Sequence, residues 1–299
     1  MELGATVLSG FALAALAPWI YRLGRQATGW LLALLPLALL AYFIKQAGII
    51  VDGYVLYESH EWVPSLGIHF SFLVDGLGLL FALLITGIGA LVLIYSGGYL
   101  AGHPQLGRFY LYILAFMASM LGVVTAGNLI TLFVFWELTS ISSYFLIGFD
   151  HERAEARTAA LQALLVTGVG GLAMLAGFIL LGQAGGSLEL SALLSHGDTV
   201  RQHPLYLAML LLVLTGAFTK SAQVPFHFWL PNAMEAPAPV STYLHSATMV
   251  KAGIYLLARL GPVLGGTGAW HYIVTLTGAA TMGAGAYLAL RQTDLKRIL

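Results

Sequence analysis

The sequence predicts an all-α polytopic membrane protein with about nine or ten transmembrane helices. Of its 299 residues, 59% are apolar and only 9% are charged, whereas soluble domains carry roughly 25% charged residues. Apolar runs of about 17–25 residues recur along the whole chain. A helix of that length crosses the hydrocarbon core, which is about 30 Å thick, at about 1.5 Å per residue.

The composition also excludes several classes of function. The net charge is zero and no basic run occurs, which argues against nucleic-acid binding. The chain has no cysteine, so disulfides, thiolate metal ligands and a cysteine nucleophile are all excluded. No motif for a metal, nucleotide or other cofactor occurs, and no catalytic set can be argued from spacing.

The expected spans follow one another with short connections. They are residues 3–21, 29–50, 72–97, 109–127, 129–149, 158–183, 205–223, 238–260 and 269–290, with a tenth beginning near Asp294. The first lacks a basic flank before it, so we expect a retained helix rather than a signal peptide. The polar stretch 51–71 predicts an interfacial excursion or hairpin, and 184–204 is the longest polar linker.

The distribution of Lys and Arg predicts the orientation of the chain. One side would receive eight cations and the other would receive three, namely Lys45, Arg201 and Arg259. The eight are Arg22, Arg25, Arg108, Arg153, Arg157, Arg291, Lys296 and Arg297. The positive-inside rule therefore predicts an N-terminus outside the cell.

Three expected spans each carry an ionisable residue within the membrane: Glu137, Lys220 and Lys251. A charge at a helix centre costs about 2.5–3.5 kcal/mol on insertion scales, so such groups are paired, hydrated or used. Ser140 and Tyr144 follow Glu137 at helical spacing and predict one polar stripe. The alternative is a structural ion pair that only fixes helix register.

The seventh span should be interrupted. Pro225 lacks an N–H and its ring would clash with the carbonyl of Ser221, so we expect a break near 223–226, just after Lys220. A discontinuous helix beside an ionisable group is typical of ion sites in transporters, although a simple proline kink is the alternative. His227 could face the same cavity or lie at the membrane interface.

The polar residues of the eighth span predict that one face of this helix lines a hydrated path. At about 100° per residue one face collects the polar side chains Ser241, His245, Thr248, Lys251, Tyr255 and Arg259. Changing the separation of Glu137 and Lys220 would change how strongly each binds a proton. His245 and hydroxyls such as that of Thr248 could pass protons between these groups. By contrast, Asp75 and Glu235 are expected to be structural, Asp75 because it heads a helix.

The chain resembles a known family in three stretches: "FWELTSISSYFLIGF", "TKSAQVPFHFWLPNAMEAPAPVSTYLHSATMVKAGIYLLARL" and "TDLKRIL". They are similar to the antiporter-like subunits shared by Mrp-type cation/proton antiporters and respiratory complex I. "WELTSISSYFLIGF" and the lysine in "HSATMVKAG" make the chain look most like the large A subunit of the Mrp sodium/proton antiporter.

The resemblance implies roles for individual residues. Glu137, Lys220, Lys251 and His245 match the family's membrane-embedded proton relay. Lys296 matches a lysine that joins two half-channels, although composition alone would make it a cytoplasmic surface charge. The resemblance also implies a three-helix segment 1–108 with an extracytoplasmic loop, a first inverted repeat 109–260 with the broken seventh helix, and a second repeat starting at 261–299 and truncated.

The function implied is that of one component of a secondary antiporter that exports Na⁺ in exchange for H⁺ and is not itself an enzyme. Its expected setting is the plasma membrane, among lipids and other hydrophobic antiporter subunits. One alternative is a proton-pumping subunit of a complex I-type or hydrogenase redox complex. Another is a non-transporting scaffold. No cluster of oxygen ligands stands out as a sodium site.

Overall fold

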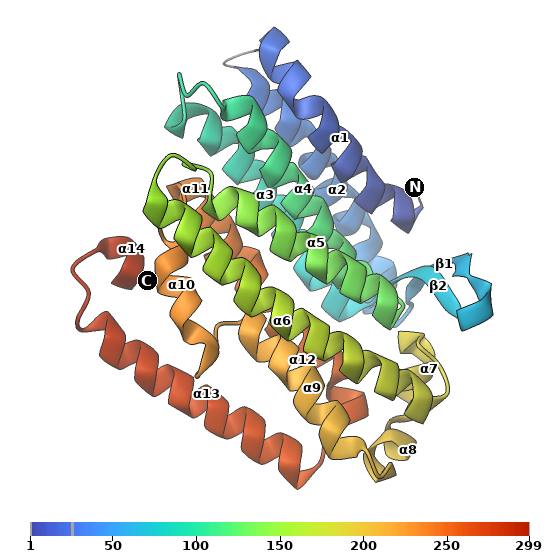
Figure 1. Cartoon of the computed structure of the whole chain (residues 1–299). Coiled ribbons are helices and arrows are strands. Elements are labelled where there is room, and N and C mark those ends of the chain that lie inside the picture. The colour runs from blue at the N-terminus through green and yellow to red at the C-terminus, as the bar shows by residue number, and fades with distance from the viewer. Residues whose placement is uncertain (1, 25–26, 299) are drawn as a thin grey trace.

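The chain folds as a bundle of long helices with one small β-hairpin at its edge (Figure 1). The computed structural model describes residues 2–24 and 27–298; Arg25, counted above for the orientation, lies outside them. The N-terminal elements are α1 (Leu3–Gly24), α2 (Thr28–Val51), β1 (Leu56–Val63), η2 (Pro64–Leu66), β2 (Ile68–Val74), α3 (Gly76–Tyr99), α4 (Leu106–Thr125), α5 (Leu129–Ile147) and α6 (Ala154–Gly185).

Ten further elements complete the described part of the chain, and two of them, near its end, are long helices. They are α7 (Leu190–Ser195), α8 (Gly197–Gln202), α9 (Tyr206–Lys220), η3 (Phe226–Phe228), α10 (Trp229–Ala233), α11 (Ala238–Ser241), η4 (Thr242–Thr248), α12 (Met249–Leu264), α13 (Gly268–Ala289) and α14 (Leu295–Ile298).

The described residues contain seven helices long and apolar enough to cross a membrane. Six are α1 to α6, and the seventh is the continuous helix Ala238–Leu264, made of α11, η4 and α12. The remaining two expected spans are α9, a shorter apolar helix, and α13, which has 22 residues. The chain is therefore a multi-span membrane protein with the predicted helical architecture.

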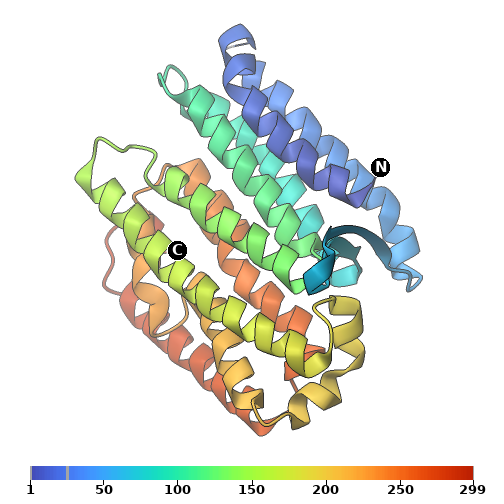
Figure 2. The same ribbon diagram turned by 45° about the vertical axis from the view of Figure 1, so that its right-hand side comes forward.

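The helices pack side by side along one shared direction. The contacts join α1 to α4, α2 to α3, α4 to α5, α5 to α6 and α6 to α9. Figure 2 shows α1 and α2 at one side of the bundle and α13 at the other. In Figure 1 the beginnings of α4 and α6 and the short α14 lie toward the left, and the hairpin with α7 and α8 lies toward the right.

The predicted excursion at 51–71 is an antiparallel hairpin. Its strands pair from Leu56 opposite Val74 to Val63 opposite Ile68. The third span begins at Gly76, later than the predicted residue 72, because the last residues of the run pair in β2. An apolar run alone does not distinguish a strand from a helix end.

Glu58 ties the hairpin to the beginning of α1. Its carboxylate accepts the N–H groups of Leu3 and Gly4 and contacts His60 at 2.8 Å. Burial raises the pKa of Glu58, but these hydrogen bonds outweigh it and leave the pKa below its usual value. The first-turn N–H groups of a helix favour such an anion.

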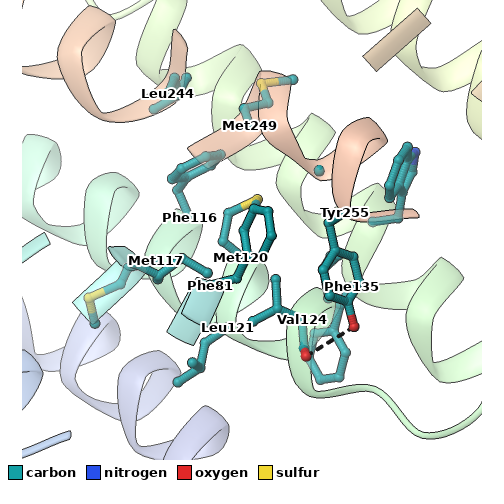
Figure 3. Close-up of a cluster of buried hydrophobic side chains, with 14 of the residues drawn as sticks. Phe81, Phe116, Met117, Met120, Leu121, Val124, Phe135, Leu244, Met249 and Tyr255 are labelled. Atoms are coloured by element: carbon teal, nitrogen blue, oxygen red, sulfur yellow. Dashed lines mark hydrogen bonds between the residues drawn. The ribbon is translucent and has the colours of Figure 1, made fainter. Parts of the chain in front are cut away.

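The core between α3, α4, α5 and α12 is filled by large apolar side chains (Figure 3). Phe81 packs edge-on against Tyr255, with ring centroids 5.3 Å apart. The hydroxyl of Tyr255 donates to the carbonyl of Val124 at 3.1 Å, drawn as the dashed line in Figure 3. Val124 is in the last turn of α4, where carbonyls lack partners within the helix, so this bond fixes α12 against the end of α4.

Candidate functional site: a broken helix around a buried lysine

Lys220 is the last residue of α9, at the point where the expected seventh span breaks. The helix stops before Pro225 and resumes in η3 and α10. It therefore ends earlier than predicted, one turn before the proline, because the ring would clash with the carbonyl four residues back if the helix continued. Ala222, within the break, has a φ of 50°, which costs about 1–2 kcal/mol for a residue with a Cβ.

Two of the carbonyls at the end of α9 accept hydrogen bonds from the broken segment. The indole N–H of Trp229 donates to Thr219 at 2.9 Å, and the backbone N–H of Gln223 donates to Phe218 at 2.9 Å. The sequence predicted that the break would free carbonyls near Lys220. These two instead have partners from the broken segment, as buried backbone groups require.

Lys220 is fully buried and its ammonium is held by α5. Nζ donates to the hydroxyl of Ser140 at 2.7 Å and to the carbonyl of Trp136 at 3.1 Å. The Trp136 ring lies 5.2 Å from Nζ, within the range of a cation–π contact. One turn of α5 therefore supplies both oxygen acceptors and an aromatic face to a single buried cation.

Glu137 lies beside this cluster without closing an ion pair. Among the described residues, no carboxylate oxygen is within 4.0 Å of Lys220 Nζ, although Glu137 is close enough for a Coulombic interaction with it. Glu137 Oε1 is buried and has no hydrogen-bond partner in the part of the chain that the structure describes. Glu137 and Lys220 are thus neighbours without a direct ion pair, and the hydrogen-bond partners of Lys220 are neutral oxygens.

Adjacent glycines of α6 make room for this arrangement. A Cβ on Gly171 would lie 1.9 Å from Glu137 Oε1, and one on Gly170 would lie 1.8 Å from the hydroxyl oxygen of Thr219. Real Cβ atoms do not approach other atoms so closely. Glycine at both positions therefore allows α5 and α9 to pack against the same face of α6.

His245 and Thr248 lie in η4, a π-helical segment. The ring of His245 contacts that of Trp229, with centroids 6.0 Å apart, and neither ring nitrogen makes a hydrogen bond within the described residues. Thr248 donates to the carbonyl of Tyr243, five residues back, at 2.6 Å. Single π-helical turns occur often at functional sites.

Because of the π-helical segment, the polar residues of the eighth span do not share the single face that the sequence predicted. The sequence placed six polar residues on one face by assuming 100° per residue throughout, but a π-helical turn holds more residues than an α-helical turn. His245 faces Trp229 of α10, whereas Tyr255 and Arg259 face α4 and α3. Lys251 is half-buried, and no hydrogen bond or ion pair reaches it from the described residues.

Arg259 forms a bidentate ion pair with Asp75. Its Nη1 and Nη2 lie 2.5 and 2.8 Å from the two carboxylate oxygens, and its Nε donates to Tyr255 at 3.1 Å. Asp75 also caps α3 by accepting the N–H of Gly78 at 2.9 Å. Burial raises the pKa of Asp75, but the hydrogen bonds and charge of Arg259 outweigh it and leave the pKa below its usual value.

Lys296 reaches from α14 to the end of α10. Its Nζ donates to the carbonyls of Met234 at 2.8 Å and Ala236 at 2.6 Å. Burial lowers the pKa of Lys296, and the charges of Asp294 and Glu235 oppose that shift only in part. Lys296 is therefore not a free surface charge, and it lies within electrostatic range of His245.

Glu235 holds α14 in place, in keeping with the structural role expected for it. Its two carboxylate oxygens lie 2.6 Å from a guanidinium nitrogen of Arg153 and 3.2 Å from one of Arg297. These contacts join the beginning of α6 to the residue after Lys296. The two ion pairs of Glu235 thereby restrict the position of the Lys296 side chain.

The supporting residues have separate environments. Ser221 donates to the carbonyl of Val250 and joins the break to α12. The Nδ1 atom of His227 is buried and has no hydrogen-bond partner in residues 2–24 and 27–298. Tyr144, predicted to share a stripe with Ser140, instead lines a surface pocket at the C-terminal end of α5. Only Ser140 of that stripe contacts Lys220.

Trp136 and Trp229 were not singled out from the sequence, yet they hold the site together. Each lies next to a break or charge that the sequence did mark, and each is fully buried. Tryptophan beside an intramembrane charge was the available signal, because its ring and N–H satisfy a cation and a carbonyl at once. No group of three or more His, Asp or Glu residues that could hold a metal ion occurs in residues 2–24 and 27–298.

Known proteins resemble this chain in sequence and in fold. The chain is 52% identical over 294 residues to the A subunit of the Na(+)/H(+) antiporter of Alkalihalophilus pseudofirmus, covering 98% of this chain and 36% of that protein. It is 51% identical over 300 residues to the A/B subunit of the probable K(+)/H(+) antiporter of Rhizobium meliloti, covering 99% of this chain and 30% of that protein. The chain thus spans about a third of the length of these relatives.

A solved structure shares the fold. A chain of the Mrp complex from Dietzia sp. superposes with a TM-score of 0.89 at 36% identity, over 99% of this chain and 32% of that one. Residues 62–110 match the N-terminal family of complex I chain 5. Residues 126–299, more than half of the chain, match the family described as NADH:quinone oxidoreductase/Mrp antiporter, TM. The chain belongs to this NADH:quinone oxidoreductase/Mrp antiporter transmembrane family.

Proposed function

We propose that this chain carries a proton-conducting half-channel of a secondary cation/proton antiporter, which exports Na⁺ in exchange for H⁺. The observation that carries the proposal is the fully buried Lys220 at the end of a broken helix, bound to neutral oxygens of Ser140 and Trp136, with the unpaired Glu137 carboxylate oxygen nearby. Intramembrane ionisable residues at a discontinuous helix are typical of transport sites.

The relay would begin with the Glu137 and Lys220 pair. Because the two are within Coulombic range but make no direct contact, a small movement of either helix changes the energy of keeping both charged. Ser140 offers an oxygen that accepts from Lys220 in one state and donates in another. A proton could therefore leave Lys220 when Glu137 loses its charge or moves away.

From Lys220 the relay would continue toward His245 and Lys296. Trp229 contacts His245 and also bonds to Thr219, the residue before Lys220. The ring nitrogens of His245 make no hydrogen bond of normal geometry within the described residues, and both the backbone of Ala233 and the charge of Lys296 act on the ring. Lys251, half-buried and unpaired within the described residues, would exchange protons with water in the same region.

The proposed setting follows from the family and the distribution of cations. The N-terminus would lie outside a bacterial or archaeal plasma membrane, and the ends bearing Arg22, Arg108 and Lys296 would be cytoplasmic. Residues 109–260 would form the first repeat, after a three-helix segment 1–108, and 261–299 would begin a second. The protein would act with other hydrophobic antiporter subunits, as the complex named for the Dietzia structure suggests.

The test uses the full-length protein within its complex. Glu137→Ala and Lys220→Ala should each abolish the Na⁺-dependent dissipation of a pH gradient in everted vesicles, and Lys45→Ala, an exposed lysine on α2, should not. K⁺ and Li⁺ are assayed in parallel, since one relative is named for K⁺. Full activity of a normally assembled Lys220→Ala complex would rule the proposal out.

A redox-driven proton pump is the second candidate, because both matching families include complex I subunits. The same relay would then serve a distant redox module. Purification with flavin or iron–sulfur proteins would support this alternative, and purification with small hydrophobic subunits would support the antiporter. A scaffold role predicts instead that Glu137→Gln impairs assembly and leaves transport by assembled complexes intact.

A further inference from the structure

A pocket of about 240 Å³ opens where the ends of α4, α5 and α6 meet. Arg108 lies in the first turn of α4 and Arg157 in the first turn of α6, while Gly148 caps the end of α5. All three helices are candidate membrane spans, so the pocket lies at the level where a span leaves the hydrocarbon. This is the depth of lipid headgroups.

The pocket carries positive charge that the described residues do not neutralise. Arg108 donates to Gln105 at 3.2 Å and to the Tyr112 hydroxyl at 3.1 Å. Arg157 donates to two backbone carbonyls, those of His151 and Glu152, at 2.6 and 2.9 Å.

Neither guanidinium has a carboxylate within ion-pairing distance among the described residues, and no acidic side chain lines the pocket. The hydrogen bonds therefore hold two guanidinium groups in place and leave their charges available to an anion. Guanidinium groups suit phosphate especially well.

The pocket continues into an apolar surface on the membrane side. The ring of Phe145 stacks on that of Tyr112, with centroids 5.0 Å apart, and Phe145 and Ile141, one turn apart on α5, are both exposed. On α6, Leu161 follows Arg157 by one turn on the same face and is exposed as well. A phosphate in the pocket would thus have apolar side chains directly beneath it.

We propose that this pocket binds an anionic phospholipid, with the phosphate between Arg108 and Arg157 and the acyl chains along Ile141, Phe145 and Leu161. The combined charge and apolar surface distinguish a lipid from a free phosphate, which would use the two arginines alone. Basic pockets between transmembrane helices on the cytoplasmic side are typical sites for such headgroups. Tyr112 and Tyr144 also line the pocket, as expected for aromatic residues at an interface.

Native mass spectrometry of the full-length protein in its complex tests the site. Phosphatidylglycerol is titrated against the wild type, an R108Q/R157Q variant and an R22Q/R291Q control that removes two other exposed arginines from the same side. The R108Q/R157Q variant should bind at least about tenfold more weakly, because two charge-assisted contacts are lost. The control should bind like the wild type, and phosphatidylcholine should not distinguish the three.

Two further arms separate the lipid from other occupants. Inorganic phosphate at millimolar concentration should fail to displace phosphatidylglycerol, and R108K/R157K should bind better than R108Q/R157Q because the charge remains. Unchanged binding by R108Q/R157Q, an equal loss in the R22Q/R291Q control, or displacement by inorganic phosphate would each overturn the proposal.

Discussion

Lys220 donates a 2.7 Å hydrogen bond to the hydroxyl of Ser140, across the contact between α9 and α5. This bond, rather than an ion pair with Glu137, gives the buried ammonium its closest partner. A full ion pair at this depth would hold both charges tightly and oppose proton release, because the attraction is strong where water is excluded. A hydroxyl satisfies the ammonium without adding a second fixed charge, which suits the proposed role of Lys220 in gaining and losing a proton.

Ser140→Ala should weaken both the fold and transport. It removes one of the two oxygen acceptors of a fully buried cation, and a lost hydrogen bond to a charged group costs about 1.5–3 kcal/mol. We expect a lower unfolding temperature of the purified protein and slower Na⁺-dependent proton movement in vesicles.

The matched control for that variant is Ser142→Ala. Ser142 is also buried on α5, but its hydroxyl bonds to the helix's own carbonyls of Leu138 and Thr139. Its removal should leave transport unchanged, while Ser140→Thr, which keeps a hydroxyl, should recover much of the activity. Equal losses from Ser140→Ala and Ser142→Ala would show that the Lys220 contact has no special importance.

Gly171→Ala should displace the Glu137 carboxylate. The added methyl would lie 1.9 Å from Oε1, so either the side chain of Glu137 must rotate or α6 must move away from α5. We expect transport to fall at least as far as in a conservative Glu137→Gln variant, measured in the same vesicle assay.

Gly168→Ala is the control on the same helix. A Cβ there meets nothing within 4 Å, and alanine favours the helix over glycine by about 0.8–1.0 kcal/mol. This variant should therefore be as active as the wild type and slightly more stable. If Gly171→Ala were equally harmless, the close packing over Glu137 would play no part in transport.

Much of the architecture was predictable because membrane spans impose a strong pattern. The length of each apolar run and the position of Pro225 led to the long helices and the break. The residues 72–74 were wrongly assigned to a helix, since an apolar strand and an apolar helix end look alike in one sequence. Their pairing with β1 depends on contacts along the hairpin that no local pattern encodes.

The sequence indicated which residues belong to the candidate site more readily than it indicated which atoms they contact. Glu137 and Lys220 were evident as charges in apolar runs, and the sequence suggested that they interact, but it did not indicate which atoms bind Lys220. The actual acceptors, Ser140 and the carbonyl of Trp136, depend on how α9 packs against α5. Likewise the π-helical turn that includes His245 changes the register of the eighth span, and helical periodicity assumes that such turns are absent.

Asp75→Asn should make stability less sensitive to acid. The pKa of Asp75 is lowered in the folded protein, so its stabilising effect is present above its unfolded pKa of about 3.9 and is lost as the pH falls through the lower folded value. The wild type should therefore lose stability below about pH 4 more steeply than the variant.

The same variant should also be less stable near neutral pH. It leaves Arg259 buried without its ionic partner, and removing one partner of a buried pair costs about 3–5 kcal/mol; the 30% exposure of the Asp75 side chain reduces that cost. Thermal unfolding in detergent from pH 3 to pH 7, compared with an exposed-site variant Asp198→Asn, measures both effects. Parallel pH curves for wild type and Asp75→Asn would contradict the ion-pair account.

Lys296→Gln should flatten the stability profile at alkaline pH. The pKa of Lys296 is lowered in the folded protein, whereas in an unfolded chain it is about 10.4. Between the two values the unfolded state binds more protons, so the free energy of unfolding rises with pH. The variant lacks this contribution, and its unfolding temperature should rise less than that of the wild type as the pH rises toward the unfolded pKa of about 10.4.

Lys45→Gln, at an exposed position on α2, provides the comparison for the Lys296 experiment. Because the Lys45 side chain is exposed in the folded protein, this variant should follow the wild-type curve. Lys296→Gln also removes the hydrogen bonds to the carbonyls of Met234 and Ala236. This second effect lowers the stability by a similar amount at every pH, so it does not by itself change the slope of stability against pH. A slope equal to that of the wild type would mean that Lys296 titrates as a solvent-exposed group, and that burial beside α10 does not affect its proton.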